Sequence, residues 1–129
     1  MKSALFDQAV QRITQRRPEI HRDAYFFLKE SLDLALAEQR KSSTPGRHVS
    51  ASQLTEAFAS HALQSFGPMA VTVLSEWGLT KTGDIGQMVF DLIDEKMFGR
   101  QQSDTPDDFG NVYSFHEKFE KPYLPVGLE

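Results

Sequence analysis

FGPMAVTVLSEWGLTKTGDIGQMVFDLIDEKM, residues 66–97, is the stretch around which the chain is organised. Near its start, Gly67-Pro68 combines a residue that can close one helix with a residue that suits the first turn of the next. Apolar residues then recur at the spacing of one helical face, and Gly78 is placed to end the run. They are Ala70, Val73, Leu74 and Trp77. The pattern predicts a short helix from Pro68 to about Gly78.

A second, longer helix is predicted after Leu79. A threonine of the turn at residues 80–83 can cap its N-terminus, and Asp84 lies in its first turn, where a negative charge opposes the helix dipole. Lys96 lies in its last turn, and Phe98-Gly99 marks its predicted end. One face is apolar through Ile85, Val89, Leu92 and Ile93, with Met88 and Met97 at its margins. Two helices joined by a tight turn predict a helix-turn-helix unit.

Three further helices are predicted before this unit. Ser3 can cap the first, which ends before Pro18 because proline disfavours a helical conformation in the residue that it follows. The second covers residues 21–40, and its wide apolar stripe, with Phe26 and Leu34 outside it, is typical of a central helix. The third opens with a capping box at residues 50–53. Residues 41–47 are predicted to be a surface loop, and residues 48–49 a short extended piece.

The segment after Gly99 allows two interpretations. Residues 105–108 can cap a helix with one face formed by Phe109, Val112, His116 and Phe119. Alternatively, residues 112–115 alternate as one short strand after a turn. The glycine at position 110 favours a turn followed by a strand or an irregular segment. Residues 120–129 contain two prolines and are predicted to be an extended C-terminal tail. The predicted fold is therefore mainly α: a compact single-domain helical bundle of about five helices, residues 1–119, with at most one small β element.

Length and composition indicate one globular domain. The chain has 129 residues, of which 40% are hydrophobic and 25% are charged. No apolar run approaches the length that spans a membrane, and Asp7 and Gln8 interrupt the region where a signal peptide is apolar. The chain has no cysteine, which excludes disulfides and thiol catalysis. We therefore predict a cytoplasmic protein.

The charge is unevenly spread along the chain. Residues 1–48 hold nine Lys and Arg against six Asp and Glu, whereas residues 49–129 hold five against twelve, so the two parts carry +3 and −7. An acidic surface is a poor electrostatic match for a phosphate backbone. The basic side chains are local and typical of solvated helix ends. They are Arg12, Arg16, Arg17, Arg22, Arg40, Lys41 and Arg47.

None of the four histidines shows the spacing of a metal site or of a catalytic motif. His61 lies on the apolar face of its helix, which predicts a buried, hydrogen-bonded core histidine. His48, in a loop before a helix, is the candidate functional residue, since a histidine there can bind an anion or act as a base. His21 and His116 are predicted to lie at the surface. The sequence thus predicts no catalysis, no cofactor and no metal, with an enzyme or metal protein built on His48 as the lowest-ranked hypothesis.

Two groups of carboxylates are candidates for binding. Asp104, Asp107 and Asp108 share one loop, but this loop lacks the glycine and the glutamate of an EF-hand, so turn formation explains it better. The second group lies on the predicted helix after residue 83. It consists of Asp84, Asp91, Asp94 and Glu95. A separation of seven residues places Asp84 and Asp91 on one side of that helix. We interpret this side as a solvated face, with a surface for a basic partner as the alternative.

Several short motifs stand out between residues 24 and 119. They are Arg47-His48-Val49, Phe66-Gly67-Pro68-Met69-Ala70, Val73-Leu74, Trp77-Gly78, Asp84 with Gly86, Val89-Phe90 and Asp108-Phe109. Taken together, they resemble an uncharacterised family of short bacterial proteins of unknown function. The resemblance implies a stand-alone bacterial domain and assigns no functional residue.

The order of the predicted elements also resembles that of winged-helix domains, which is an analogy of fold alone. In such a domain, the second helix of the central unit would read DNA with its N-terminal residues. Those residues are Thr82, Gly83, Asp84 and Gln87, and none of them is basic. Specific DNA binding by this helix is therefore disfavoured.

These observations lead to one functional prediction and one alternative. We predict a small protein-interaction module, adaptor or regulatory, that works without catalysis and contacts an unidentified protein partner through its acidic helix face. The alternative is a winged-helix-like nucleic-acid-binding protein that uses its basic N-terminal half. In that case Arg12, Arg16, Arg17 and Arg47 would contact phosphates.

Overall fold

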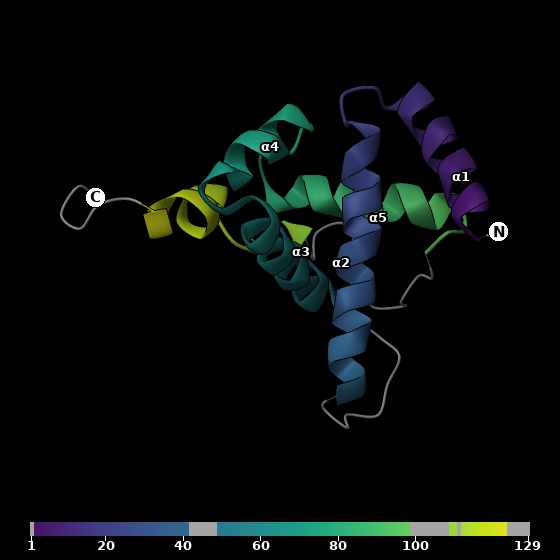
Figure 1. The fold of residues 1–129 in the computed structure, drawn as a ribbon. Helices are drawn as coiled ribbons and strands as arrows, with labels where there is room; N and C mark the ends of the chain where they lie inside the picture. Colours follow the sequence, from purple (N-terminus) through teal and green to yellow (C-terminus); the bar gives the residue numbers. More distant parts are fainter. Residues whose placement is uncertain (1, 42–48, 99–108, 111, 124–129) are drawn as a thin grey trace.

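The computed structural model describes residues 2–41, 49–98, 109–110 and 112–123, and these residues are mainly helical (Figure 1). They contain the α-helices α1 (Lys2–Arg16), α2 (Arg22–Lys41), α3 (Ala51–Phe66), α4 (Ala70–Glu76) and α5 (Thr82–Asp94). Three short segments accompany them: the 3-10 helices η1 (Gly67–Met69) and η4 (Lys121–Tyr123), and the π-helix η3 (His116–Glu120). The predicted mainly α fold of about five helices is confirmed.

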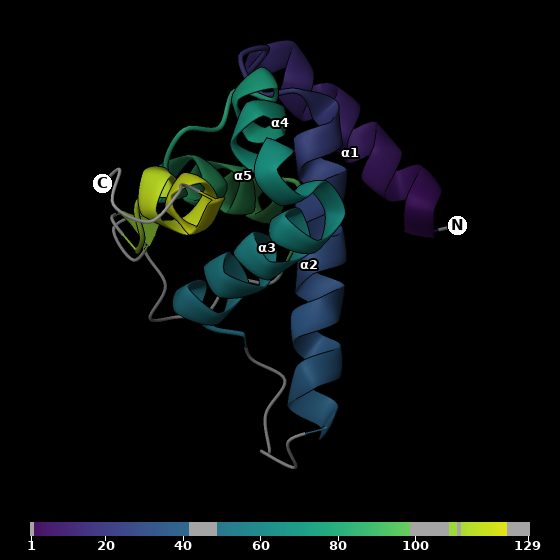
Figure 2. The same cartoon turned by 60° about the vertical axis from the view of Figure 1, so that its left-hand side comes forward.

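The long helix α2 lies at the centre of this arrangement (Figure 1, Figure 2). α1 and α3 both pack against α2, and α5 contacts α1, α2 and α3. The apolar faces of the helices meet in one core, whose largest fully buried side chains are the rings of Tyr25, Phe58, Phe109 and Phe119. The C-terminal half of α2 extends beyond the other helices in both views. One wall of this half is therefore less covered than the rest of α2.

The predicted start of α3 and the predicted end of α4 are confirmed, whereas α4 begins at Ala70 because Pro68 lies in η1. The Ser50 Oγ accepts from the Gln53 N–H at 3.1 Å and the Gln53 Oε1 accepts from the Ser50 N–H at 2.9 Å, which is a capping box. α4 is closed by Gly78 in the left-handed conformation, with φ 89°. A side chain at this position would collide with the carbonyl oxygen of Glu19. The connection between α1 and α2 therefore lies directly against the turn after α4.

The end of α5 differs from the prediction. The helix ends at Asp94, so Lys96 lies after the helix and not in its last turn. Lys96 adopts the left-handed conformation that glycine usually supplies at a helix end, with φ 62°. Its N–H donates to the Ile93 carbonyl at 2.9 Å, and the Met97 N–H donates to the Leu92 carbonyl at 2.8 Å. These two bonds form a Schellman motif, which stops the helix before the predicted end at Phe98-Gly99.

The described residues contain no strand, so of the two outcomes predicted for residues 112–115, a strand or an irregular segment, the irregular segment is the one observed. Two rings turn inward from this irregular segment, because both have partners in the core. Tyr113 donates from its hydroxyl to the Thr55 carbonyl at 2.8 Å, and the Phe115 ring meets the Phe119 ring edge-on at 5.0 Å. Val49 is also outside any strand, and its predicted strand neighbour at position 48 lies outside the described residues.

The start of the predicted C-terminal tail is helical. Residue 120 closes η3, and residues 121–123 form η4. Residues 124–129, the rest of the predicted extended segment, lie outside the part of the chain that the structure describes.

Candidate functional site

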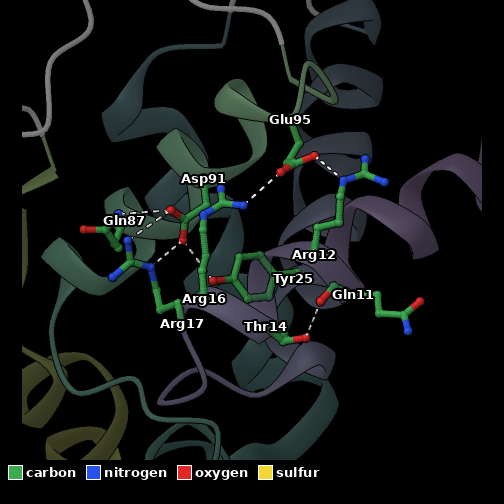
Figure 3. A network of polar contacts seen from close by, with 9 residues as sticks. All are labelled: Gln11, Arg12, Thr14, Arg16, Arg17, Tyr25, Gln87, Asp91 and Glu95. Atoms are coloured by element: carbon green, nitrogen blue, oxygen red, sulfur yellow. Dashed lines mark hydrogen bonds and ion pairs between the residues drawn. The ribbon is translucent and has the colours of Figure 1, made fainter.

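Asp91, on α5, is a buried carboxylate with only 2% of its surface exposed. Arg17 donates to both carboxylate oxygens, from Nε to Oδ2 at 2.8 Å and from Nη2 to Oδ1 at 3.3 Å (Figure 3). The Tyr25 hydroxyl donates to Oδ2 at 3.0 Å, and the Gln87 Nε2 donates to Oδ1 at 3.2 Å. Each oxygen thus accepts two hydrogen bonds, and these compensate for the loss of water around the charge.

The surroundings of Asp91 keep two of its donors protonated. The hydrogen bond to the carboxylate raises the pKa of the Arg17 guanidinium. Burial raises the pKa of the Tyr25 phenol above its ordinary value of 10.0, and the negative charge of Asp91 reinforces this effect. Both side chains therefore remain hydrogen-bond donors at neutral pH.

Glu95 extends these contacts by one helical turn. Its Oε1 accepts from the Arg12 Nε at 2.8 Å, and its Oε2 accepts from the Arg16 Nη1 at 2.8 Å (Figure 3). The hydrogen bonds from Arg12 and Arg16 lower the pKa of Glu95, so its carboxylate stays ionised to lower pH than usual. We refer to the seven residues that join α1, α2 and α5 in this way as the α1–α5 ion-pair network. They are Arg12, Arg16, Arg17, Tyr25, Gln87, Asp91 and Glu95.

The four carboxylates of the predicted acidic face have different surroundings. Asp91 and Glu95 face the arginines of α1, and Asp84 accepts from two backbone N–H groups before α5, at 2.9 and 3.3 Å. Asp94 is exposed. The interpretation of the Asp91 position as solvated is therefore wrong, since the basic surface that it meets belongs to its own chain. No local sequence signal reveals this contact, because Asp91 and its arginine lie 74 residues apart.

The same contacts involve three of the four arginines that the nucleic-acid alternative requires. Arg17 is bound to a buried carboxylate, while the Arg12 and Arg16 side chains are paired but still 54% and 42% exposed. The fourth arginine, at position 47, lies outside the described residues. The candidate functional residue His48 lies there too, as do Asp104, Asp107 and Asp108.

A groove of about 810 Å³ lies between α2 and α3. We call it the α2–α3 groove. Its apolar lining consists of Leu34, Ala35, Val49 and Ala57, its charged lining of Glu38 and Glu56, and its polar lining of Ser52, Gln53, Ser60, His61 and Gln64. Leu34 is 49% exposed and lies in this groove beside other apolar groups. The sequence signal for this groove was the position of Leu34 outside the stripe of its helix.

His61 links the α2–α3 groove to a cluster of aromatic rings. It lies flat on the Phe27 ring, with centroids 4.0 Å apart, and the rings of Phe66 and Trp77 each lie 5.4 Å from Phe27. His61 Nε2 is 2.9 Å from a carboxylate oxygen of Glu30. The predicted hydrogen bonding of His61 is confirmed, but its side chain is 18% exposed and borders the groove rather than lying in the core.

Comparison with family models, curated proteins and solved structures found no match for this chain. The fold therefore defines the class of protein: a mainly α-helical chain that packs five α-helices in its described part. No helix in that part is both long and apolar enough to cross a membrane. The described residues also bring together no group of three histidines or carboxylates that could hold a metal ion.

Proposed function

We propose that this chain is a small cytoplasmic protein-interaction module that binds a segment of a partner protein in the α2–α3 groove. One observation carries the proposal: Leu34 stands half-exposed in a groove with three other apolar residues and a polar rim. Binding sites for partner segments combine an apolar floor with polar groups at the edge in this way. Such a module acts through binding and needs no catalytic residue.

The proposal keeps the interaction role predicted from the sequence, but it places the binding surface in the α2–α3 groove and not on the acidic face of α5. The predicted acidic face of α5 offers a partner little free charge, because Asp91 and Glu95 are paired within the chain and Asp84 caps its helix. Asp94 alone among these four is exposed and free of such a role in the described structure. The resemblance to an uncharacterised bacterial family stays a prediction and adds no site.

A winged-helix-like nucleic-acid-binding function is the competing proposal. Arg12 and Arg16 are each paired through one nitrogen and stay about half-exposed, so their other N–H groups can contact phosphates. Arg17, in contrast, would have to leave Asp91 as a buried and unpaired charge. Affinity for duplex DNA that falls steeply with added salt would favour this alternative. Flat fluorescence anisotropy of a labelled duplex at low salt would exclude it.

Site-specific cross-linking tests the proposed surface. A photoreactive amino acid replaces Leu34 or Ser60 in the groove, and Thr72 or Glu76 on α4 serves as the matched exposed control. In lysate of the cells that make the protein, we expect one protein to cross-link at both groove positions, at neither control position, and equally well after nuclease treatment. Equal cross-linking at all four positions would contradict the groove. Loss of the captured protein on nuclease treatment would favour the nucleic-acid alternative.

A further inference from the structure

We infer that the occupant of the α2–α3 groove is an amphipathic helix whose apolar stripe is flanked by lysine or arginine. This inference rests on the proposed function and names the chemistry of the partner segment. It follows from three features of the groove: its walls, its length and its charge.

The walls favour a helix over an extended segment. Both walls are α-helices, whose backbone N–H and C=O groups are already bonded within the helix. An extended segment would bring its own unpaired backbone groups, and only side chains such as Ser52, Ser60 and Gln64 could bond to them. A helix satisfies its own backbone and needs only an apolar stripe for the floor.

The length of the groove sets the length of the helix. On α3 the lining extends from Ser52 to Gln64, which corresponds to roughly 18 Å at the rise of an α-helix. On α2 the lining extends only from Leu34 to Glu38, which is about one turn, so a partner helix of about three turns would follow α3 and meet α2 over one turn. His61, stacked on Phe27, lies near the Gln64 end, so a large apolar side chain of the partner would pack there.

The charge of the groove sets the flanks of the helix. Glu38 on α2 and Glu56 on α3 are the charged side chains among the described lining residues, and they stand on opposite walls. The Lys118 Nζ donates to both Glu56 oxygens, at 3.0 and 2.8 Å, yet the Glu56 side chain remains 53% exposed. The exposed carboxylates of Glu38 and Glu56, on opposite walls, are complementary to an apolar stripe with basic residues on both sides.

Binding of designed peptides tests this chemistry. The probe is a labelled, tryptophan-free amphipathic peptide of about 14 residues, with a leucine stripe flanked by lysines. Its two controls carry glutamate in place of every lysine, or the same residues in an order without a stripe. The full chain is titrated with each peptide, followed by fluorescence anisotropy and by the emission of Trp77, the single tryptophan, which lies close to Phe27.

We expect the lysine peptide to bind about tenfold more tightly than the glutamate peptide at low salt, as two or three rim ion pairs of ordinary strength would give. The double variant Glu38→Gln/Glu56→Gln should lose most of this preference. The matched variant Glu76→Gln/Asp94→Asn changes the net charge equally at exposed positions outside the groove and should retain it. Leu34→Gln should weaken binding of the lysine peptide without changing the charge.

Several outcomes would overturn the inference. If the glutamate peptide binds as well as the lysine peptide, and Leu34→Gln weakens both, the groove binds helices but the charge assignment is wrong, and the proposed function stands. If neither peptide binds up to millimolar concentration while the groove still cross-links a protein, the partner is not a basic helix. A dimer that dissociates in the Leu34→Gln variant would assign the groove to a second copy of this chain.

Discussion

The α1–α5 ion-pair network and the α2–α3 groove are both contacts between helices, and both contain carboxylates. In the network every carboxylate meets an arginine of the same chain, and the apolar residues beneath are covered. In the groove, two glutamates flank a half-exposed leucine. The comparison shows that Asp91 and Glu95 meet bases that cover them, whereas in the groove Glu56 bonds to Lys118 and its side chain still remains 53% exposed. The following predictions test this contrast, from the largest expected effect to the smallest.

Asp91→Ala should break the network at its buried centre. It leaves the Arg17 guanidinium and the Tyr25 hydroxyl without their acceptor, so the free energy of unfolding should fall by about 3 kcal/mol. Urea denaturation followed by circular dichroism measures this change. The matched control is Asp94→Ala on the same helix, where the exposed position predicts a change within about 0.5 kcal/mol. Equal changes at the two positions would mean that the buried contacts of Asp91 do not contribute to the free energy of unfolding.

Tyr25→Phe removes one donor and keeps the buried ring. The loss of a hydrogen bond to a charged acceptor should cost about 1.5 kcal/mol at neutral pH. Because folding raises the pKa of Tyr25, its contribution is fully present below its ordinary value of 10.0 and is lost as the pH rises further. Urea midpoints measured between pH 8 and pH 11 should therefore fall less in Tyr25→Phe than in the unaltered protein. If the urea midpoints of both proteins fall equally as the pH rises, the ionisation of Tyr25 does not cause the loss of stability.

Glu95→Gln tests the exposed edge of the network. Its arginine partners are half-exposed, so the free energy of unfolding should fall by only about 0.5–1 kcal/mol. This difference should become smaller in high salt. Folding lowers the pKa of Glu95, so its contribution is present above the ordinary value of 4.5 and is lost as the pH falls below it. Thermal midpoints of the two proteins should therefore converge in acid. A difference that persists at pH 2 would show that packing, not charge, is lost.

Leu34→Gln should have the smallest effect on stability and the largest effect on binding. The side chain is already half-exposed, so the free energy of unfolding should change by no more than about 0.5 kcal/mol. Leu28→Gln, one and a half turns earlier at a fully buried position, provides the contrast and should cost about 3 kcal/mol. Chemical denaturation measures both. A large destabilisation in Leu34→Gln would mean that this leucine serves the fold rather than a partner.

The sequence predicted the features that depend on neighbouring residues. The capping box at Ser50 and the stop at Gly78 follow from residues within one turn, and both are present. Lys96 takes the conformation that sequence patterns assign to glycine, so the end of α5 was predicted too late. The rings of Tyr113 and Phe115 turn inward without a strand, because their partners lie on α3 and η3. An alternation of only two aromatic residues was too short to distinguish a strand from an irregular segment.

The candidate site was harder to predict than the fold. The arginine–carboxylate pairs of the network join residues 74 to 83 positions apart, and the sequence contains no signal for pairing at that distance. Asp91 and Glu95 therefore had the same pattern as ordinary solvated carboxylates. One sequence feature indicated the groove: Leu34 lies outside the apolar stripe of its helix. Its two glutamates lie on different helices, Glu38 on α2 and Glu56 on α3, so the sequence alone does not show that they border one groove.

The separation between α1 and α5 also sets an order of events during synthesis. α1 leaves the ribosome first and can pack on α2 soon afterwards, but the acceptors for its arginines lie 74 to 83 residues further along the chain. At ordinary rates of translation, these acceptors follow after roughly 4 to 17 s. During that interval the nascent chain carries three arginines that lack these acceptors. The ion pairs between α1 and the C-terminal end of α5 can therefore form only when most of the domain has been made.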